Sequence, residues 1–300
     1  MENVISNERR ARSLRRVTNA AVAVASTLAL AKLLVWWRSG SVALLASAVD
    51  SALDTSASLL NALAVRYALK PADDDHRFGH GKSEALAGLA QAALITGSAG
   101  FIVVHALDRL LHPRPLQSVA ASLAVMVVAT GATLGLVIYQ RKVAQRTGST
   151  AIKADALHYV SDLASNTAAI LALGCARFGW TQIDAWLGIA IALATLYGAL
   201  SIGREVFQIL MDRELPVDVQ ERIRTIALAH AEVRGLHALR TRRSGPTTLI
   251  QFHLELDPAL SLVDANRIAH EVSRALDREF PGADVLIHQD PWNAGQARGA

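Results

Sequence analysis

The chain has 300 residues, of which 52% are hydrophobic and only 19% are charged, whereas a typical soluble domain carries roughly 25% charged residues. Its one cysteine, Cys175, excludes an internal disulfide and a thiolate metal cluster. The composition also excludes an intrinsically disordered chain and a collagen-like repeat. Nearly all long apolar segments lie before Asp212, so the sequence predicts a membrane domain followed by a soluble one.

Six segments approach or exceed the roughly 20 apolar residues that cross a bilayer as a helix. Within lipid, only a helix satisfies the backbone hydrogen bonds of such a segment internally. The first segment is too long for the apolar part of a signal peptide and lacks a small-residue cleavage site, so we expect no signal peptide. The predicted spans are residues 17–37, 41–69, 85–104, 118–139, 157–176 and 185–202.

The basic residues are distributed unevenly between the two sides of these spans. If the N-terminus is cytoplasmic, thirteen Lys and Arg residues fall inside and only Arg38, Arg109, Arg114 and Arg177 fall outside. The positive-inside rule therefore predicts that both termini are cytoplasmic. Because this topology accounts for the net charge of +4, we expect contact with membrane lipid and no nucleic-acid partner.

After Asp212 the apolar pattern becomes that of a soluble domain. Two segments have helical periodicity, one alternates between apolar and polar side chains, and two shorter segments are typical of strands. The order αββαβ predicts a small two-layer α+β domain. The expected elements are helices at 217–231 and 262–280 and strands at 236–241, 247–256 and 283–288.

The predicted fold is therefore a membrane all-α bundle of six transmembrane helices plus a small cytoplasmic α+β domain. Its boundaries follow the changes in composition. The expected regions are a basic cytoplasmic N-terminal tail at 1–16, the six-helix transmembrane domain at 17–212, the αββαβ domain at 213–292 and a C-terminal tail at 293–300.

Two of the predicted spans carry pairs of ionisable residues. Asp50 and Asp54 are four residues apart, as are His158 and Asp162, so each pair lies on one face of its helix. One such residue at the bilayer centre costs about 2.5–3.5 kcal/mol. If the two faces meet, three carboxylates and an imidazole converge, a donor set that suits tetrahedral zinc and related divalent ions.

A single polar residue in a span also has structural explanations. A lone aspartate caps a kink or pairs with Lys32, and Asn166 makes an ordinary hydrogen bond between helices. Two acidic or imidazole pairs on separate helices are harder to explain in that way. The sequence therefore predicts a cation site within the membrane.

Polar clusters outside the spans offer further metal ligands. The loop between the second and third spans contains Asp73, Asp74, Asp75, His76 and His80. The two histidines, with neighbouring acids, are able to complete a coordination sphere. The alternative is that a polar loop collects Asp and His for solvation alone.

The soluble domain carries a third cluster. His253 belongs to the polar face of its strand, and His288 and Asp290 are two residues apart, which places them on one strand face. His237 comes from the preceding strand. An isolated surface histidine does not indicate a metal site. Three imidazoles and a carboxylate on one sheet, however, predict metal binding.

Enzymatic motifs are missing from the sequence. There is no GxxxxGK[ST] loop for a nucleotide, and His270-Glu271 is not followed by the second histidine of HExxH. No GxSxG elbow occurs either. The sequence favours a carrier over an enzyme, with no nucleotide cofactor.

Several segments together resemble the cation diffusion facilitators, and within that family the bacterial zinc and ferrous-iron efflux branch. The resemblance extends from about Leu14 to Pro291. The segments that carry it are SAVDSALD at 47–54, PADDDHRFGHGKSEALA at 71–87, ADALHYVSDLASN at 154–166, and LRTRRSGPTTLIQFHLE followed by DVLIHQDP at 284–291.

The resemblance implies an integral protein of the bacterial inner membrane, with a metallochaperone-like αββαβ domain, that works as a homodimer exchanging divalent metal for protons. It places the transport site at Asp50, Asp54, His158 and Asp162. Members that carry manganese tend to have Asp in place of the imidazole, so His158 favours Zn²⁺, with Cd²⁺ and Fe²⁺ as alternatives.

The resemblance also specifies which residues of the loop cluster and of the soluble-domain cluster are metal ligands. It implies a loop site of Asp73, His76 and His80, and a cytoplasmic site in which the Asp290 carboxylate bridges two ions. Members of the family have one more histidine ligand, at the position where this sequence has Asn266. His270 lies one helical turn later and is the candidate to replace that missing ligand. The implied cytoplasmic ligands are His237, His253, His288 and Asp290.

Lys82 and Asp212 are implied to form a salt bridge that joins the two protomers. The alternative is a solvated lysine and an aspartate at a helix end.

The main functional hypothesis is a proton-coupled antiporter that exports divalent metal, with a cytoplasmic domain that binds metal, regulates transport and stabilises the dimer. The rival is a membrane sensor or store that binds the same ions without moving them. A channel and an intramembrane hydrolase are weaker alternatives.

Overall fold

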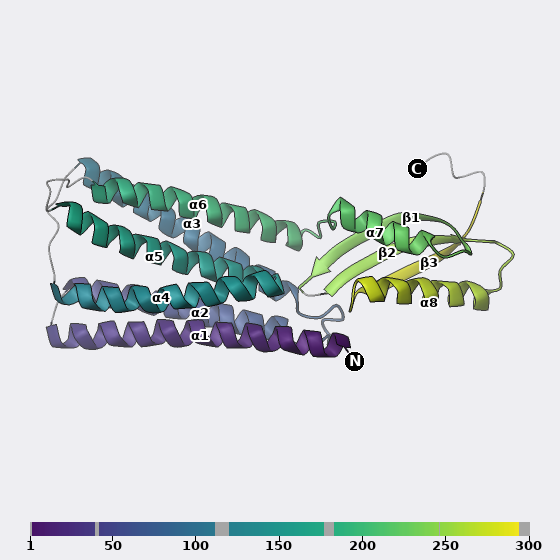
Figure 1. The fold of residues 1–300 in the computed structure, drawn as a ribbon, viewed down its shortest axis with the longest axis horizontal. Coiled ribbons are helices and arrows are strands. Elements are labelled where there is room, and N and C mark those ends of the chain that lie inside the picture. The colour runs from purple at the N-terminus through teal and green to yellow at the C-terminus, as the bar shows by residue number, and fades with distance from the viewer. Residues whose placement is uncertain (1, 40–41, 112–119, 177–182, 246, 294–300) are drawn as a thin grey trace. The chain divides into compact units, whose positions relative to one another are not determined.

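The computed structural model describes residues 2–39, 42–111, 120–176, 183–245 and 247–293 (Figure 1). The chain separates into two compact units. Residues 6–71 and 82–207 form a helical unit, and residues 1–5, 72–81 and 208–300 form a second unit. The start of the fourth predicted span, Arg114, Arg177 and most of the predicted C-terminal tail lie outside the described residues.

The long helices of the chain follow the six predicted spans (Figure 1). Most extend beyond the apolar segments, because polar residues with good helix propensity continue a helix past the edge of the lipid. The predicted N-terminal tail is part of the first helix from residue 2 onward. The helices are α1 (Glu2–Ser39), α2 (Val42–Ala68), α3 (Lys82–Leu111), α4 (Ala120–Thr147), α5 (Thr150–Ala176) and α6 (Ile183–Leu210).

Three of the described helical segments are long and apolar enough to cross a membrane by length and composition alone. They are Glu8–Arg38, Lys82–Asp108 and Ala185–Leu210. By contrast, α2 and α5 carry the ionisable residues discussed above, which lower the mean hydropathy of both helices. The two helices that carry the candidate ligands are therefore not among these three segments, and the described part of α4 is not among them either.

Helix α5 lies at the centre of the packing in the helical unit, where it contacts α2, α3 and α4. Small side chains permit this close approach: Ala151 and Ala154 of α5 are fully buried. On α6, a Cβ at Gly198 would lie 3.0 Å from Leu157 Cδ2, so α6 also packs closely against α5. This arrangement brings the polar face of α5 against that of α2.

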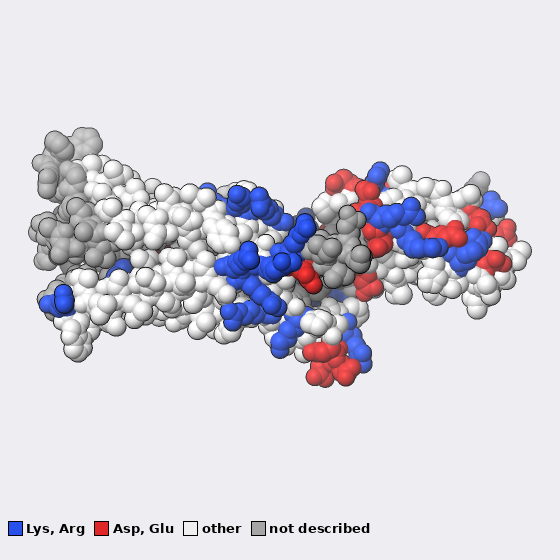
Figure 2. Space-filling model, turned by 60° about the horizontal axis from the view of Figure 1, so that its bottom comes forward, with Lys and Arg blue, Asp and Glu red and all other residues white. Residues whose placement is uncertain are grey.

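The charged side chains of the helical unit are concentrated at one end. Figure 2 shows Lys and Arg gathered there, whereas most of the rest of the unit's described surface in this view is uncharged. Arg66 and Arg146 belong to the last turns of α2 and α4, and Lys153 to the start of α5. An apolar belt with a basic end is the pattern expected for a membrane domain.

The second unit contains the predicted αββαβ order. Strand β2 pairs antiparallel with β1 and parallel with β3, so the sheet order is β1-β2-β3. The outer strands are longer than predicted because regular pairing continues past their apolar centres. The elements are α7 (Val217–Leu228), β1 (Val233–Ser244), β2 (Thr247–Leu256), α8 (Leu262–Glu279) and β3 (Asp284–Pro291).

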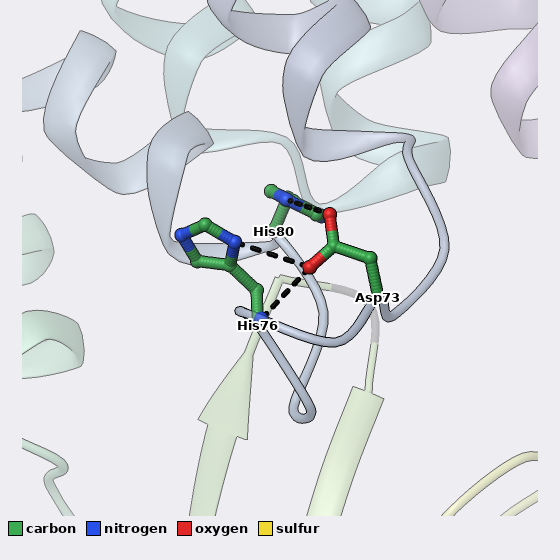
Figure 3. A group of neighbouring side chains, drawn as sticks. All are labelled: Asp73, His76 and His80. Atoms are coloured by element: carbon green, nitrogen blue, oxygen red, sulfur yellow. Dashed lines mark hydrogen bonds and ion pairs between the residues drawn. The ribbon is translucent and has the colours of Figure 1, made fainter.

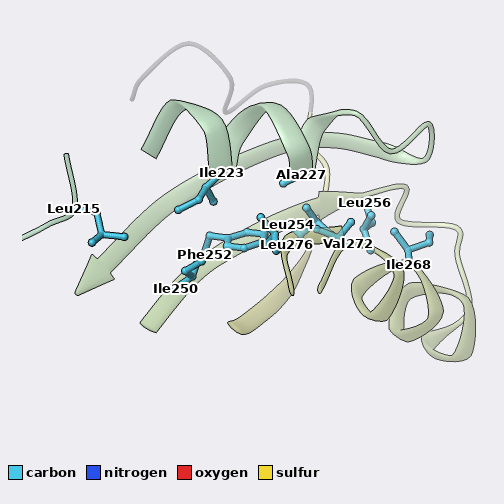
Figure 4. Packing of buried hydrophobic residues seen from close by; sticks show 10 residues of the cluster. All are labelled: Leu215, Ile223, Ala227, Ile250, Phe252, Leu254, Leu256, Ile268, Val272 and Leu276. Atoms are coloured by element: carbon cyan, nitrogen blue, oxygen red, sulfur yellow. The ribbon is translucent and has the colours of Figure 1, made fainter. Parts of the chain in front are cut away.

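A compact apolar core lies between the sheet and the helices α7 and α8 (Figure 4). Phe252 and Leu254 are at most 1% exposed and lie on the β2 face that packs against the helices. Ser261 caps α8 by accepting a hydrogen bond from the Asp264 backbone N–H at 3.1 Å. Because both helices cover one face, the polar side chains of β2 project from the other face, and His253 is among them.

Candidate metal centres

A three-ligand group forms where α2 meets α5. The His158 Nε2 atom lies 2.9 Å from Asp54 Oδ1 and 3.6 Å from Asp162 Oδ2. One ligand atom from each residue can be chosen so that all lie within 4.8 Å of one another. The i, i+4 spacing of the α5 pair and the packing of α5 on α2 therefore produce the convergence predicted for these three residues.

Asp50 lies one turn before Asp54 on α2 and is exposed. It is not part of the close group among the residues that the structure describes. Its neighbour Ser51 accepts a hydrogen bond from Lys32 Nζ of α1 at 2.7 Å. Asp50 therefore remains a predicted fourth ligand on the same helix face as Asp54.

Hydrogen bonds between helices support this region. Ser58 of α2 and Tyr159 of α5 share a buried hydrogen bond of 2.7 Å, and Thr195 of α6 donates to Ser161 of α5 at 3.1 Å. Polar contacts of this kind hold helices together in a lipid environment, where apolar contacts alone provide little specificity. They fix the rotation of α5 that directs His158 toward α2.

The loop before α3 forms a second group (Figure 3). Asp73 Oδ1 lies 3.2 Å from His76 Nδ1, and Asp73 Oδ2 lies 3.3 Å from His80 Nε2. The His76 backbone N–H also donates to Asp73 Oδ1 at 2.8 Å. Asp74 instead pairs with Arg77 at 2.9 Å. Of the acids in the predicted cluster, Asp73 is thus the one that contacts the histidines.

The Asp73 carboxylate is prepared for ligation. The backbone hydrogen bond from His76 is the main cause that holds its pKa below the usual value, and the two imidazoles add to the effect. His80 is buried, whereas His76 is exposed. A cation at this site would have one imidazole already ordered by packing and a carboxylate that is ionised at neutral pH.

A row of three histidines crosses the open face of the sheet. In the strand register His237 pairs with His253, and His253 pairs with His288. The ring centroids of His237 and His253 are 5.0 Å apart, and those of His253 and His288 are 4.7 Å apart. Opposite positions on neighbouring strands place their side chains side by side, so the register assembles the donor row.

Asp290 joins the three histidines. Its Oδ2 lies 2.8 Å from His253 Nδ1 and 3.3 Å from His237 Nε2, and its Oδ1 lies 3.1 Å from His288 Nε2. The hydrogen bond from His253 is the main cause that lowers the pKa of Asp290. Because its two oxygens face different histidines, the carboxylate has the arrangement of a bridging ligand. The donor set of imidazoles and a carboxylate suits Zn²⁺.

Glu255 is a residue of this centre that sequence reasoning missed. Its Oε1 lies 2.9 Å from His237 Nδ1, which leaves His237 Nε2 to face Asp290. A carboxylate on the second ring nitrogen orients a histidine ligand and selects its tautomer. The alternation of β2 places Glu255 on the same polar face as His253, and this signal was available in the sequence.

Local backbone features make room for the Glu255 side chain. A Cβ at Gly235, opposite Glu255 in the sheet, would lie 2.3 Å from Glu255 Oε2. The register also shifts between His237 and Arg240, where Ala238 has a φ of +50°. A bulge of this kind redirects the adjacent side chain, and here that side chain is His237.

The sequence matches the cation efflux transmembrane domain over residues 19–211 and the cytoplasmic domain of cation efflux proteins over residues 215–292. The chain belongs to the cation efflux family. The cation-efflux pumps FieF of Klebsiella pneumoniae and Escherichia coli (strain K12 / DH10B) are 48% and 47% identical to it, over 95% of both chains. A solved structure of the proposed zinc transporter CzrB is 34% identical and covers 26% of this chain and 99% of its own, with a TM-score of 0.26.

This membership confirms the predicted organisation: a helical transmembrane domain followed by a cytoplasmic αββαβ domain. It also confirms the prediction of a transporter that exports divalent cations, rather than an enzyme. The cation efflux protein is an integral membrane protein.

In this cation efflux chain, His270 does not join the histidine row. It is exposed on α8, and α8 covers the apolar face of the sheet, whereas the row lies on the opposite face. Asn266 is likewise exposed on α8. Within one chain, the direction in which α8 packs therefore prevents His270 from substituting as a ligand of the row.

The predicted pair of Lys82 and Asp212 belongs to different units of the chain. In the second unit, Asp212 Oδ2 accepts a hydrogen bond from Arg242 Nη1 at 3.2 Å. Arg242 is therefore a partner of Asp212 that the sequence did not indicate. The salt bridge between protomers stays a prediction.

Proposed function

We propose that this cation efflux protein is a proton-coupled antiporter that exports Zn²⁺ from the cytoplasm, with Cd²⁺ and Fe²⁺ as further cargo. The observation that carries the proposal is the position of His158 Nε2 between the carboxylates of Asp54 and Asp162, inside the transmembrane unit. One imidazole among carboxylates favours a borderline ion over a hard one. Curated relatives of 47–48% identity are named cation-efflux pumps.

The same side chains bind metal and protons. A histidine must be neutral and a carboxylate ionised to act as ligands, so metal binding releases protons. Imidazole exchanges its proton near neutral pH. A site open to the cytoplasm would take up metal and release protons, and a site open to the opposite side would do the reverse.

We propose further that the protein is a homodimer in the bacterial inner membrane with both termini cytoplasmic. The uneven distribution of Lys and Arg supports this orientation, and the basic end of the helical unit in Figure 2 is consistent with it. The cytoplasmic domain binds metal and favours approach of the two copies, because a cation neutralises the Asp290 centre.

The primary experiment measures metal flux into proteoliposomes under an imposed pH gradient. Zinc flux should rise with the gradient in the wild type and vanish in Asp54→Ala. Asp284→Ala, an exposed acid of the other unit, is the matched control and should retain flux. Proton-coupled flux that persists in Asp54→Ala excludes the proposed site. Binding without flux for zinc, cadmium and ferrous iron excludes the antiporter and supports the sensor or store.

The regulatory proposal has its own readout. Replacing His253 and His288 together by Ala should raise the zinc concentration needed for half-maximal transport and leave the maximal flux largely intact. An unchanged zinc dependence excludes regulation through the histidine row.

A further inference from the structure

Unpartnered buried polar atoms are concentrated in one part of the helical unit. In the described part of the chain, such atoms are Asn61 Nδ2 and Oδ1, Gln140 Oε1, Asp155 Oδ1 and Thr130 Oγ1. Nearly all buried polar atoms in proteins have a hydrogen-bond partner, so each exception needs an explanation. Four of these five atoms belong to three side chains, Asn61, Gln140 and Asp155.

Asp155 is at the centre of these three residues. It belongs to α5, three residues before His158, and is 1% exposed. Gln140 of α4, which is fully buried, donates to Asp155 Oδ2 at 2.6 Å. The Asn61 side chain of α2 also interacts with Asp155, but no hydrogen bond of regular geometry joins the two. Burying an ionised carboxylate with one donor is costly, whereas a protonated acid could donate to one of the unpaired amide oxygens.

The surroundings of Asp155 connect it with the transport site. On α5, Asp155 lies three residues, about one helical turn, before His158, which itself contacts Asp54 of α2 at 2.9 Å. On α5, Asp155 lies between His158 and the helix start that carries Lys153. On α2, Asn61 lies between Asp54 and the helix end that carries Arg66. Asp155 and Asn61 therefore lie on the side of the transport site that faces the basic end of the helical unit.

Asn61 also lines a cavity between α2 and α3. The cavity has a volume of about 750 Å³, and Arg66, Lys70 and Ser83 are among its lining residues. Asn61 therefore touches both the cavity and the surroundings of Asp155.

We propose that Asp155, together with the amides of Gln140 and Asn61, forms a second proton-binding site of the transporter. This inference rests on the proposed proton-coupled exchange. When a divalent cation occupies the transport site about one helical turn away, its charge favours the ionised carboxylate. The O–H bond of Asp155 breaks, and the proton passes to water as hydronium. When the cation leaves, the carboxylate takes up a proton again.

The structural alternative is that Gln140 and Asp155 form a polar contact that holds α4 against α5. The number of protons exchanged per zinc ion distinguishes the two. With the membrane potential held at zero, the steady-state zinc ratio across a proteoliposome membrane depends on the pH difference. The slope of the logarithm of that ratio against the pH difference equals the proton count.

Asp155→Asn, which preserves shape and hydrogen bonding, should lower this slope by up to one proton per zinc ion. Glu205→Gln is the matched control, because Glu205 is an exposed acid that pairs with Lys153 at the same end of α5. It should keep the wild-type slope. An unchanged slope in Asp155→Asn overturns the inference. A slope of zero in the wild type overturns the proposed function instead.

Infrared difference spectroscopy keeps the inference testable if Asp155→Asn does not fold. Zinc binding to the wild type should remove a carboxylic acid C=O band. Gln140→Leu retains Asp155 but removes its donor, so the same band should shift in frequency. A wild type without a zinc-sensitive acid band, or a band that Gln140→Leu leaves unshifted, overturns the inference.

Discussion

Gly81 and Gly245 contact each other through their backbones. A Cβ on Gly245 would lie 2.7 Å from Gly81 Cα, and Gly245 has a φ of +58°, a conformation that favours glycine. Close by, the Arg242 guanidinium lies 5.3 Å from the centroid of the Phe78 ring. The loop that carries Asp73, His76 and His80 is thereby packed against the β1–β2 turn of its own unit.

Gly81→Ala should disrupt this contact. The new Cβ would lie 2.6 Å from the Ser244 backbone oxygen, and backbone atoms cannot rotate away. We expect a loss of about 1–3 kcal/mol in stability, together with weaker zinc binding at the loop site. Thermal unfolding of the purified protein measures the first effect. Gly97→Ala, whose Cβ meets nothing within 4 Å, should not destabilise the protein, and equal unfolding temperatures for the two variants would contradict the argument.

Replacing Glu255 should weaken zinc binding in the cytoplasmic domain in a graded way. Glu255→Gln keeps an acceptor for His237 but loses the charge, and Glu255→Ala loses both. Since ligand-orienting residues typically contribute about 10- to 100-fold in metal affinity, we expect Ala to be the weaker binder of the two. Gly235→Ala should act in the same direction by displacing the Glu255 carboxylate. Calorimetric zinc titration tests the order, with Gln251→Ala as the control on the same strand face. Affinities equal to the wild type would show that Glu255 does not position His237.

His158→Asp should change the metal preference of transport. The substitution converts the imidazole between Asp54 and Asp162 into a third carboxylate, and oxygen-only sites suit harder ions. We expect zinc flux to fall relative to manganese flux by at least about tenfold, roughly 1.4 kcal/mol in relative transition-state stability. Competing fluxes in proteoliposomes measure the ratio. A ratio that does not change would mean that the imidazole does not select the ion.

In the metal-free protein, the ionised Asp290 carboxylate should contribute to folding stability at neutral pH, and this contribution should be lost in acid. Its pKa is lowered chiefly by the His253 hydrogen bond, so the ionised form is favoured in the folded state. This contribution is fully present above the unfolded-state pKa of about 3.9 and is lost as pH falls through the lower, folded-state value. Unfolding temperatures measured between neutral pH and acid should therefore drop less in Asp290→Asn than in the wild type. Asp284→Asn, on the same strand, should follow the wild-type profile.

The local patterns in the sequence were sufficient for the secondary structure and for much of the transport group. The four-residue spacing of His158 and Asp162 fixes their common helix face, and the alternation of β2 fixes which side chains face the core. Both follow from backbone geometry within one element. The same reasoning could have found Glu255, two residues after His253.

Tertiary structure decided what depends on the contact between elements. The strand register aligned His237, His253 and His288, and the side on which α8 packs keeps the exposed His270 away from that row within one chain. Helix packing brought Gln140 and Asp155 into contact and left Asp50 outside the close transport group. The sequence by itself determined the elements and the face of each donor, because helical and strand periodicities are local. Which donors meet depends on register, helix rotation and close backbone approach, and these are set by packing between residues far apart in the chain.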